Sequence, residues 1–356
     1  MKKLFLSMAA LALLFTACDN EKNEVTQEQE IDMSDFYVFT DFSEDLSSKS
    51  VNSKGTFKNC YTMDVLNKQL NENPGLEKKM FDIEYHTRKF LAAKGKPGGG
   101  TGGGGGSTGE PDVDVLPIND GLGTITIPVY VHIVLPNAND VTNSQIQAQM
   151  SVLNDDFNST NTNLLPSGAT NFINDATLTG INFTLAGTFR YNNSTASWGT
   201  NNAVKNAYPP ITPQTHLNIW VCNIGGGILG YAQFPGGNLS TDGVVLLYSS
   251  LPGGSAAPYN LGRTATHEVG HYLNLRHIWG DGRCRQDDFV TDTPTSDGAN
   301  YGCPSYPTVN CSSTDMTMNY MDYTDDACMY MFTDGQRNRM RAIFTSGGAR
   351  AAMAGN

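Results

Sequence analysis

Three of the six histidines in this 356-residue chain lie within one stretch of eleven residues, His267–His277. His267 and His271 are four residues apart, so on a helix both imidazoles project from the same face, about one turn apart. That spacing lets both rings bind one zinc ion at about 2.0–2.1 Å. A catalytic zinc needs a third protein ligand. His277 supplies it if the helix ends near Asn274 and the chain turns back, because asparagine tolerates the left-handed backbone of such a turn.

Glu268 follows the first histidine directly, where its carboxylate can reach a water on the metal and act as general base. Three histidines leave one position of a tetrahedral ion open for that water, whose pKa zinc lowers to about 7. An HExxH sequence alone also occurs by chance on surface helices. The third histidine, a methionine-containing turn downstream and an export signal together argue against chance here. We therefore predict a catalytic zinc site.

The first residues of the chain read as a targeting signal. Two lysines precede the apolar run Leu4–Phe15, and small residues follow, the pattern of a secretory signal peptide over residues 1–17. This run is too short to cross about 30 Å of hydrocarbon. It ends in the sequence FTAC, which resembles the bacterial lipobox, whose cysteine is lipidated. We expect an acyl anchor on Cys18 that tethers the protein without spanning the membrane; the alternative is an ordinary signal peptide with an incidental cysteine.

Composition divides the rest of the chain into four parts. Residues 19–56 are acidic and poor in large apolar side chains, which is typical of a mobile tether. Apolar residues at helical spacing predict two helices within residues 57–96, with a turn at residues 73–75. The glycine-rich residues 97–111 predict a flexible linker. The main domain then spans residues 112–349.

The main domain is expected to begin with strands, and its last expected regular element is the helix that carries His267 and His271. Apolar runs predict the strands, and helical periodicity predicts one further helix. The expected strands are residues 124–134, 181–191, 216–224 and 243–248 with a short edge segment at 231–234, and the expected helix is 144–157. This order predicts a mixed α/β (α+β) fold.

The overall composition narrows the class of function. Apolar and aromatic residues make up 39% of the chain, enough to build a core. The formal net charge of −12 argues against a nucleic-acid binder, because neutralising phosphates needs a surplus of lysine and arginine. It suits carboxylate clusters, a metal or cationic substrates.

Several separated motifs, in order along the chain, resemble one family. HEVGHYLNLRH at residues 267–277 is similar to the long zinc motif of metzincin metallopeptidases, with Asn274 in place of the usual glycine. The pappalysin branch has segments similar to LNIWVCNI from Leu217, LGYAQFP from Leu229 and NYMDYTDDAC from Asn319. The resemblance covers most of residues 56–345. It implies a metzincin-like zinc peptidase domain with a mixed twisted sheet, an active-site helix and an irregular C-terminal subdomain.

The resemblance also implies roles for residues near the expected metal. Met321 would be the methionine of the turn that packs beneath the zinc without binding it. Tyr323 would stabilise the oxyanion of the tetrahedral intermediate. Asp326 matches the position that lines the S1′ pocket and selects Arg or Lys after the scissile bond; neighbouring Asp325 is the alternative. The implied substrates are therefore peptides or proteins.

Four cysteines downstream of the histidines suggest disulfides. Cys284, Cys303, Cys311 and Cys328 allow two bridges in an exported chain, with three possible connectivities. The family resemblance favours Cys284–Cys311 together with Cys303–Cys328. A structural zinc site is the alternative, although cysteine pairs at metal-site spacing are absent from the sequence.

The acidic segment Asp287–Pro294 suggests a second cation. Its density of hard oxygen ligands suits calcium, and the resemblance implies calcium in this region. The candidate ligands are Asp288, Asp292 and Thr293. The alternative is an ordinary acidic loop in which Asp292 caps a turn.

Cys60 opens the helical module in a segment that resembles the start of pappalysin propeptides. There, a cysteine thiolate occupies the open position of the zinc and blocks the water. We expect a latent zymogen with Cys60 on the zinc, activated when residues up to the linker are removed. A free structural cysteine is the alternative.

Together these patterns predict an exported, lipid-anchored and monomeric zinc endopeptidase at the cell surface or outer membrane, with the mature form released as a further option. Zinc would be catalytic and calcium structural. Two alternatives stay open: a non-catalytic, zinc-containing surface binding lipoprotein, and a zinc amidase that acts on the cell wall. The intact Glu268 disfavours the first.

Overall fold

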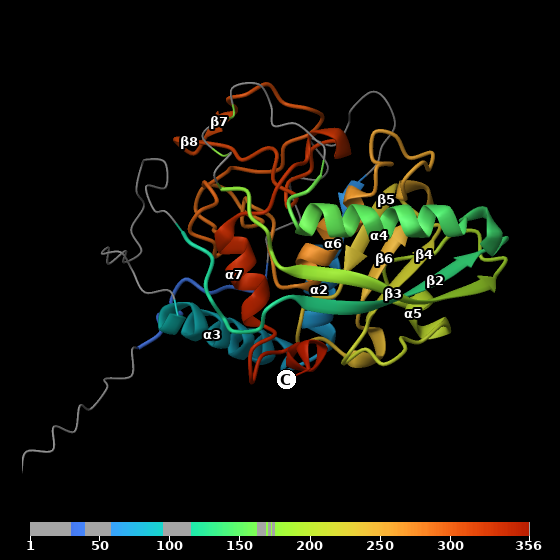
Figure 1. Cartoon of the computed structure of the whole chain (residues 1–356), viewed down its shortest axis with the longest axis horizontal. Helices are drawn as coiled ribbons and strands as arrows, with labels where there is room; N and C mark the ends of the chain where they lie inside the picture. The colour runs from blue at the N-terminus through green and yellow to red at the C-terminus, as the bar shows by residue number, and fades with distance from the viewer. Residues whose placement is uncertain are drawn as a thin grey trace, which may run out of the picture. The chain divides into compact units, whose positions relative to one another are not determined.

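The computed structural model describes residues 30–39, 58–94, 115–161, 169, 172 and 175–355 (Figure 1). Cys18, the predicted signal peptide, the predicted linker and most of the predicted tether lie outside these residues. Ile31–Asn356 form one compact unit, to which the elements below belong. Within the described ranges, no helix is both long enough and apolar enough to cross a membrane.

A six-stranded mixed sheet lies at the centre of the unit, with strand order β1-β5-β6-β4-β2-β3. The strands are β1 (Lys58–Cys60), β2 (Ile125–Leu135), β3 (Ile181–Asn192), β4 (Leu217–Cys222), β5 (Ile228–Ala232) and β6 (Val244–Leu247). β5 runs antiparallel to β6, whereas the other neighbouring pairs are parallel. The mixed sheet and its helices confirm the predicted α/β fold class.

Helix α4 (Asn143–Phe157) lies along one face of the sheet (Figure 1). Alternate residues of β2 are buried, and these side chains pack in the same cluster as Leu153 and Phe157 of α4. The helix begins with a capping box: Thr142 accepts the N–H of Gln145, and the Gln145 side chain accepts the N–H of Thr142. Threonine is one of the residue types that cap helix starts well, so a local sequence signal fixes where this helix starts.

Helix α6 (Arg263–Tyr272) carries the first two histidines and is buried along all ten of its residues. Gly270 allows Met321 to pack directly against the helix, because a Cβ at position 270 would collide with the Met321 sulfur. After the helix, Asn274 adopts the left-handed conformation at φ 77. The N–H of Leu275 donates to the Gly270 carbonyl at 3.0 Å, which closes the turn. The chain therefore reverses where the asparagine predicts.

The C-terminal part is largely irregular, as the resemblance implies. Disulfides join Cys284 to Cys311 and Cys303 to Cys328, the two pairs that the resemblance favours. Besides the main sheet, α4, α6 and the N-terminal helices, the described chain contains α5 (Ala203–Ala207), α7 (Asp334–Ala342), β7 (Val309–Asn310), β8 (Ser313–Thr314), η1 (Ala138–Asp140), η3 (Leu239–Thr241), η4 (Tyr248–Ser250), η5 (Asp326–Cys328) and η6 (Ala351–Ala354).

The N-terminal module consists of β1, α2 (Thr62–Glu72) and α3 (Leu76–Lys94), so the two predicted helices are present and the turn between them lies where the sequence predicts it. β1 is the outermost strand and pairs with β5, which would be the edge strand of the sheet without this module; Cys60 lies opposite Gly230. Apolar residues of α2 and α3 pack on Phe234, just beyond β5. α3 lies beside α7 (Figure 1). The module therefore covers the edge strand and the segment after it.

Candidate metal centre

The three predicted histidine ligands converge on one point. His271 Nε2 lies 3.1 Å from the Nε2 atoms of both His267 and His277. Two nitrogens bound at about 2.0–2.1 Å to a tetrahedral ion lie about 3.3 Å apart. The spacing of the three rings therefore matches that of a zinc site, and the turn at Asn274 is what brings His277 to the other two.

The opposite nitrogen of each ring is held by an acceptor. The Nδ1 of His267 donates to the Tyr320 carbonyl at 2.7 Å, and that of His271 donates to the Leu275 carbonyl at 2.8 Å. Because a carbonyl can only accept, both rings carry their proton on Nδ1 and direct the Nε2 lone pair at the common centre. Burial lowers the pKa of His267 to about 3 and that of His271 well below its usual range, so both rings are neutral, as ligands must be.

Cys60 adds a fourth donor from the N-terminal module. Its sulfur and one nitrogen of each of His267, His271 and His277 lie within 4.8 Å of one another, and all four residues are buried. One sulfur and three imidazoles are a donor set typical of zinc. The residues present therefore fit this metal. The pairing of β1 with β5 brings Cys60 to the centre, since its register partner Gly230 lies against Glu268.

Glu268 is buried beside the histidines and bound by a residue that the sequence did not reveal. The hydroxyl of Thr62 donates to Glu268 Oε2 at 2.7 Å and accepts the N–H of Ala232 at 2.7 Å. Thr62 thus links the candidate general base to the edge strand β5. Burial raises the pKa of Glu268 to about 8, while the Thr62 hydroxyl acts in the opposite direction.

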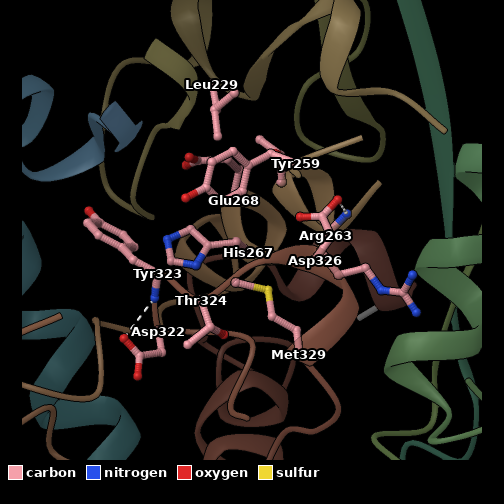
Figure 2. A pocket seen from close by; sticks show the side chains of 11 residues that line it. Leu229, Tyr259, Arg263, His267, Glu268, Asp322, Tyr323, Thr324, Asp326 and Met329 are labelled. Atoms are coloured by element: carbon pink, nitrogen blue, oxygen red, sulfur yellow. Dashed lines mark hydrogen bonds between the residues drawn. The ribbon is translucent and has the colours of Figure 1, made fainter. Parts of the chain in front are cut away.

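A pocket adjoins the centre, with His267 and Glu268 in its wall (Figure 2). Asp326 also lines it, whereas Asp325 is not one of the lining residues. One oxygen of Asp326 accepts the backbone N–H groups of Leu261 at 2.7 Å and Arg263 at 3.3 Å. Burial raises the pKa of Asp326 to about 6, against the effect of these two N–H groups. Its carboxylate is therefore a fixed part of this pocket.

Tyr323 and Met321 flank the histidines from the C-terminal part. The Tyr323 hydroxyl donates to the Cys60 carbonyl at 3.5 Å, and its ring centroid lies 4.9 Å from that of His277. Figure 2 shows this ring beside His267. Met321 is fully buried against Gly270, beneath α6. The roles that the resemblance implies for the two residues stay predictions.

The predicted calcium ligands are already hydrogen-bonded within the protein. Asp288 accepts the Thr293 hydroxyl at 2.9 Å and the Val290 N–H at 3.1 Å. Asp292 accepts the Thr333 hydroxyl and the Gly335 N–H, each at 2.7 Å, and so caps the start of α7. Within the described ranges, these carboxylates join no cluster of three or more metal-ligating side chains. The contacts give a calcium site no support, and it stays a prediction.

A convergent three-histidine site beside a buried glutamate, on a mixed α/β sheet, defines a zinc metalloendopeptidase. The family model described as pregnancy-associated plasma protein-A matches residues 200–345. An extracellular metalloprotease of Pyricularia oryzae is 37% identical over 235 residues, which cover 62% of this chain and 75% of that protein. The chain belongs to the pappalysin family of metallopeptidases.

Two solved structures of mirolysin from Tannerella forsythia are similar to this chain. Mature mirolysin with a cleaved peptide is 42% identical, with a TM-score of 0.60 and coverage of 65% of this chain and 96% of that chain. A promirolysin mutant is 36% identical, with a TM-score of 0.66 and coverage of 83% and 97%. The likeness to the precursor thus extends over more of this chain than the likeness to the mature enzyme.

Asp281 is a second residue that motif spacing did not reveal, and it yields a prediction. It is buried, and its carboxylate accepts the Nδ1–H of His277. Because such a partner orients the ring and raises its basicity, Asp281→Ala should weaken zinc binding about ten- to a hundredfold. Zinc retained against graded chelator measures this. The exposed Asp297→Ala serves as control, and equal zinc retention by both variants would contradict the role.

Proposed function

We propose that this protein is an exported, monomeric zinc endopeptidase that is made as a latent zymogen and cuts before Arg or Lys. The observation that carries the proposal is the convergence of three histidine nitrogens beside Glu268. Membership of the pappalysin family supports it, as does the likeness to a mirolysin structure with a cleaved peptide. The same proposal includes a lipid anchor on Cys18.

In the proposed reaction, His267, His271 and His277 hold the zinc. When bound, the ion supplies a Lewis acid that polarises the scissile carbonyl and acidifies the attacking water. Glu268 accepts the proton of that water and passes it to the leaving amine. The Tyr323 hydroxyl, freed from the Cys60 carbonyl, donates to the oxyanion. Glu268, Tyr323 and His267 line the same pocket, which supports these roles.

The substrate backbone is proposed to pair with β5, along the side with which β1 pairs in this structure. Gly230 supports this position, because a side chain there would press on Glu268, whose Cγ lies 2.9 Å from an added Cβ. The residue after the scissile bond would enter the pocket lined by Asp326 and Leu229. Main-chain pairing then supplies the register, and the buried carboxylate supplies the side-chain preference.

Latency is proposed to arise from three contacts of the N-terminal module. The Cys60 sulfur faces the three histidine nitrogens as a fourth donor, the Cys60 carbonyl accepts the Tyr323 hydroxyl, and the Thr62 hydroxyl donates to Glu268. The three-residue segment Cys60–Thr62 would thus block the water, the oxyanion donor and the general base. The similarity to promirolysin supports this arrangement.

Export and anchoring extend the proposal beyond the described residues. Curated relatives named extracellular metalloproteases support export. The lipobox-like FTAC sequence motivates the anchor on Cys18. Palmitate labelling of intact cells should mark the wild-type protein and spare the Cys18→Ala variant; equal labelling of the two would remove the anchor from the proposal.

Glu268→Ala tests the central proposal. The matured, zinc-loaded wild type should cut a mixed peptide library, whereas the variant should lose about a hundred- to ten-thousandfold in kcat because the general base is gone. Its zinc content should not change, which separates catalysis from metal binding. A wild-type enzyme that cuts no peptide, or that cuts only cell-wall fragments, would refute the proposal in favour of the binding lipoprotein or the amidase.

Asp326→Asn tests the proposed preference for basic residues. The amide keeps an oxygen for the N–H groups of Leu261 and Arg263 but loses the charge. Preference for Arg over Leu after the scissile bond should fall about ten- to a hundredfold, since a charge-assisted contact is lost. Asp325→Asn is the matched control and should keep the preference. The comparison is made on kcat/KM for peptide pairs.

Cys60→Ala tests latency. The uncut variant precursor should cleave a reporter peptide that the uncut wild type leaves intact, because no sulfur would then take the fourth ligand position that the water needs. Thr62→Val, which removes only the hydroxyl bound to Glu268, should release a smaller part of the activity. Cys222→Ala is the control, since Cys222 is the other free buried cysteine of the described chain. A Cys60→Ala precursor as silent as the control would argue against the mechanism.

A further inference from the structure

A buried ion pair joins the N-terminal module to the C-terminal helix α7. Arg339 of α7 donates from Nη1 to one oxygen of Glu84 at 3.1 Å and from Nη2 to the other oxygen. Both side chains are nearly inaccessible, at 3% and 2% exposure. Two parallel N–H···O bonds are the geometry by which arginine recognises a carboxylate. Glu84 lies in the segment that the proposed maturation removes, so Arg339 then loses this partner.

A second arginine stands beside the first. Arg276 donates from Nη2 to the carbonyl of Tyr37, also in the N-terminal part, and its Nη1 is buried without a hydrogen-bond partner in the described part of the chain. The guanidinium groups of Arg276 and Arg339 lie 4.9 Å and 5.5 Å from the centroid of the same ring, Phe289. Arg88 of α3 lies over the same ring at 5.1 Å. Removal of the residues up to the linker would take away Arg88, Tyr37 and Glu84, and would leave Arg276 and Arg339 on the Phe289 ring without these partners.

The arginines lie next to the metal centre. Arg339 Nε donates to the Asn274 carbonyl at 2.9 Å, and the adjacent Leu275 carbonyl accepts the Nδ1–H of His271. A cavity at this point is lined by Asn274 and the two arginines together with Phe234 and Pro235, which follow the edge strand β5. The Phe234 ring lies 5.5 Å from that of His271. The cavity therefore lies at the carboxyl end of β5.

The two ends of β5 face different pockets. Leu229, near the start of β5, lines the pocket that holds Asp326, and Phe234 beyond its end lines the pocket that holds the arginines. A peptide whose residue after the scissile bond enters the Asp326 pocket must extend its preceding residues toward Phe234. An upstream side chain of that peptide is therefore the group that meets Arg339.

We propose that maturation uncovers an anionic subsite in which Arg339, flanked by Arg276, binds an acidic side chain upstream of the scissile bond. The inference rests on the proposed peptidase function and adds a second specificity determinant to it. Glu84 occupies this subsite in the precursor as the substrate carboxylate does in the mature enzyme. Without an anion, Arg339 would keep its hydrogen bond to the Asn274 carbonyl and its contact with the Phe289 ring but no carboxylate, so a substrate carboxylate restores a lost charge partner.

Fluorogenic peptides with Arg after the scissile bond test the subsite, with Glu or Gln placed in turn at positions P2 to P5. Enzyme matured from the full chain should cut the Glu peptide about five- to tenfold faster in kcat/KM at one of these positions, through a lower KM. In the matured Arg339→Gln variant the ratio should fall to about one. Added salt should lower the ratio in the wild type only.

The variant is made together with Glu84→Gln, so that the precursor contains a neutral pair instead of an unpaired buried charge. Glu84→Gln alone is the matched control, because its mature enzyme is identical to the wild type if the segment is removed. If zinc content and thermal unfolding show that Arg339→Gln misfolds, Arg276→Gln carries the same comparison. Equal cleavage of Glu and Gln peptides by wild type at every position, or an unchanged ratio in the variant, would overturn the subsite. Failure of wild type to cut any peptide refutes the peptidase function itself.

Discussion

The turn that ends α6 is the constraint on which the site depends. Because Asn274 is in the left-handed conformation, the Leu275 N–H can donate to the Gly270 carbonyl. In this turn the Leu275 carbonyl accepts the Nδ1–H of His271, and the Asn274 carbonyl accepts the Nε–H of Arg339. A single reversal of the backbone therefore delivers the third histidine, orients the second and positions the arginine of the proposed subsite. Asparagine performs this turn because its side chain tolerates the left-handed region better than other non-glycine residues do.

Local signals made much of the fold and part of the site predictable. Periodicity and capping, which act over a few residues, predict strands β2, β3, β4 and β6, helix α4 with its Thr142 cap and the two N-terminal helices. They do not predict the three-residue strand β1. The histidine spacing is equally local. Thr62 and Arg339 could not be found in this way, because polar contacts across about two hundred residues of sequence leave no periodic trace. Asp281 could have been predicted from the sequence, because it lies four residues after His277 and a carboxylate often orients a metal-bound imidazole.

The N-terminal module would inhibit by holding many weak contacts at once. β1 contributes three residues of pairing, Thr62 a hydrogen bond to Glu268, and Glu84 an ion pair some distance along the chain. Each contact is worth about a few kcal/mol at most. Because all belong to one chain, their effective concentration is high, and no soluble peptide competes with them easily. Once the segment is cut, each contact is lost with the others, so cleavage converts a stable latent state into an open cleft.

The direction of the bound peptide needs a cause beyond backbone pairing. β1 shows that β5 accepts a parallel partner, since Cys60 lies opposite Gly230 in that orientation. An edge strand offers its N–H and C=O groups to parallel and antiparallel neighbours alike. A carboxylate at one end of β5 and two guanidinium groups at the other break that symmetry. A peptide that is acidic upstream and basic downstream gains at both ends in the antiparallel orientation and is repelled at both ends when reversed. Under the proposed function, charge thus determines the orientation of the peptide and therefore which peptide bond faces Glu268, while backbone pairing with β5 supplies the main-chain hydrogen bonds.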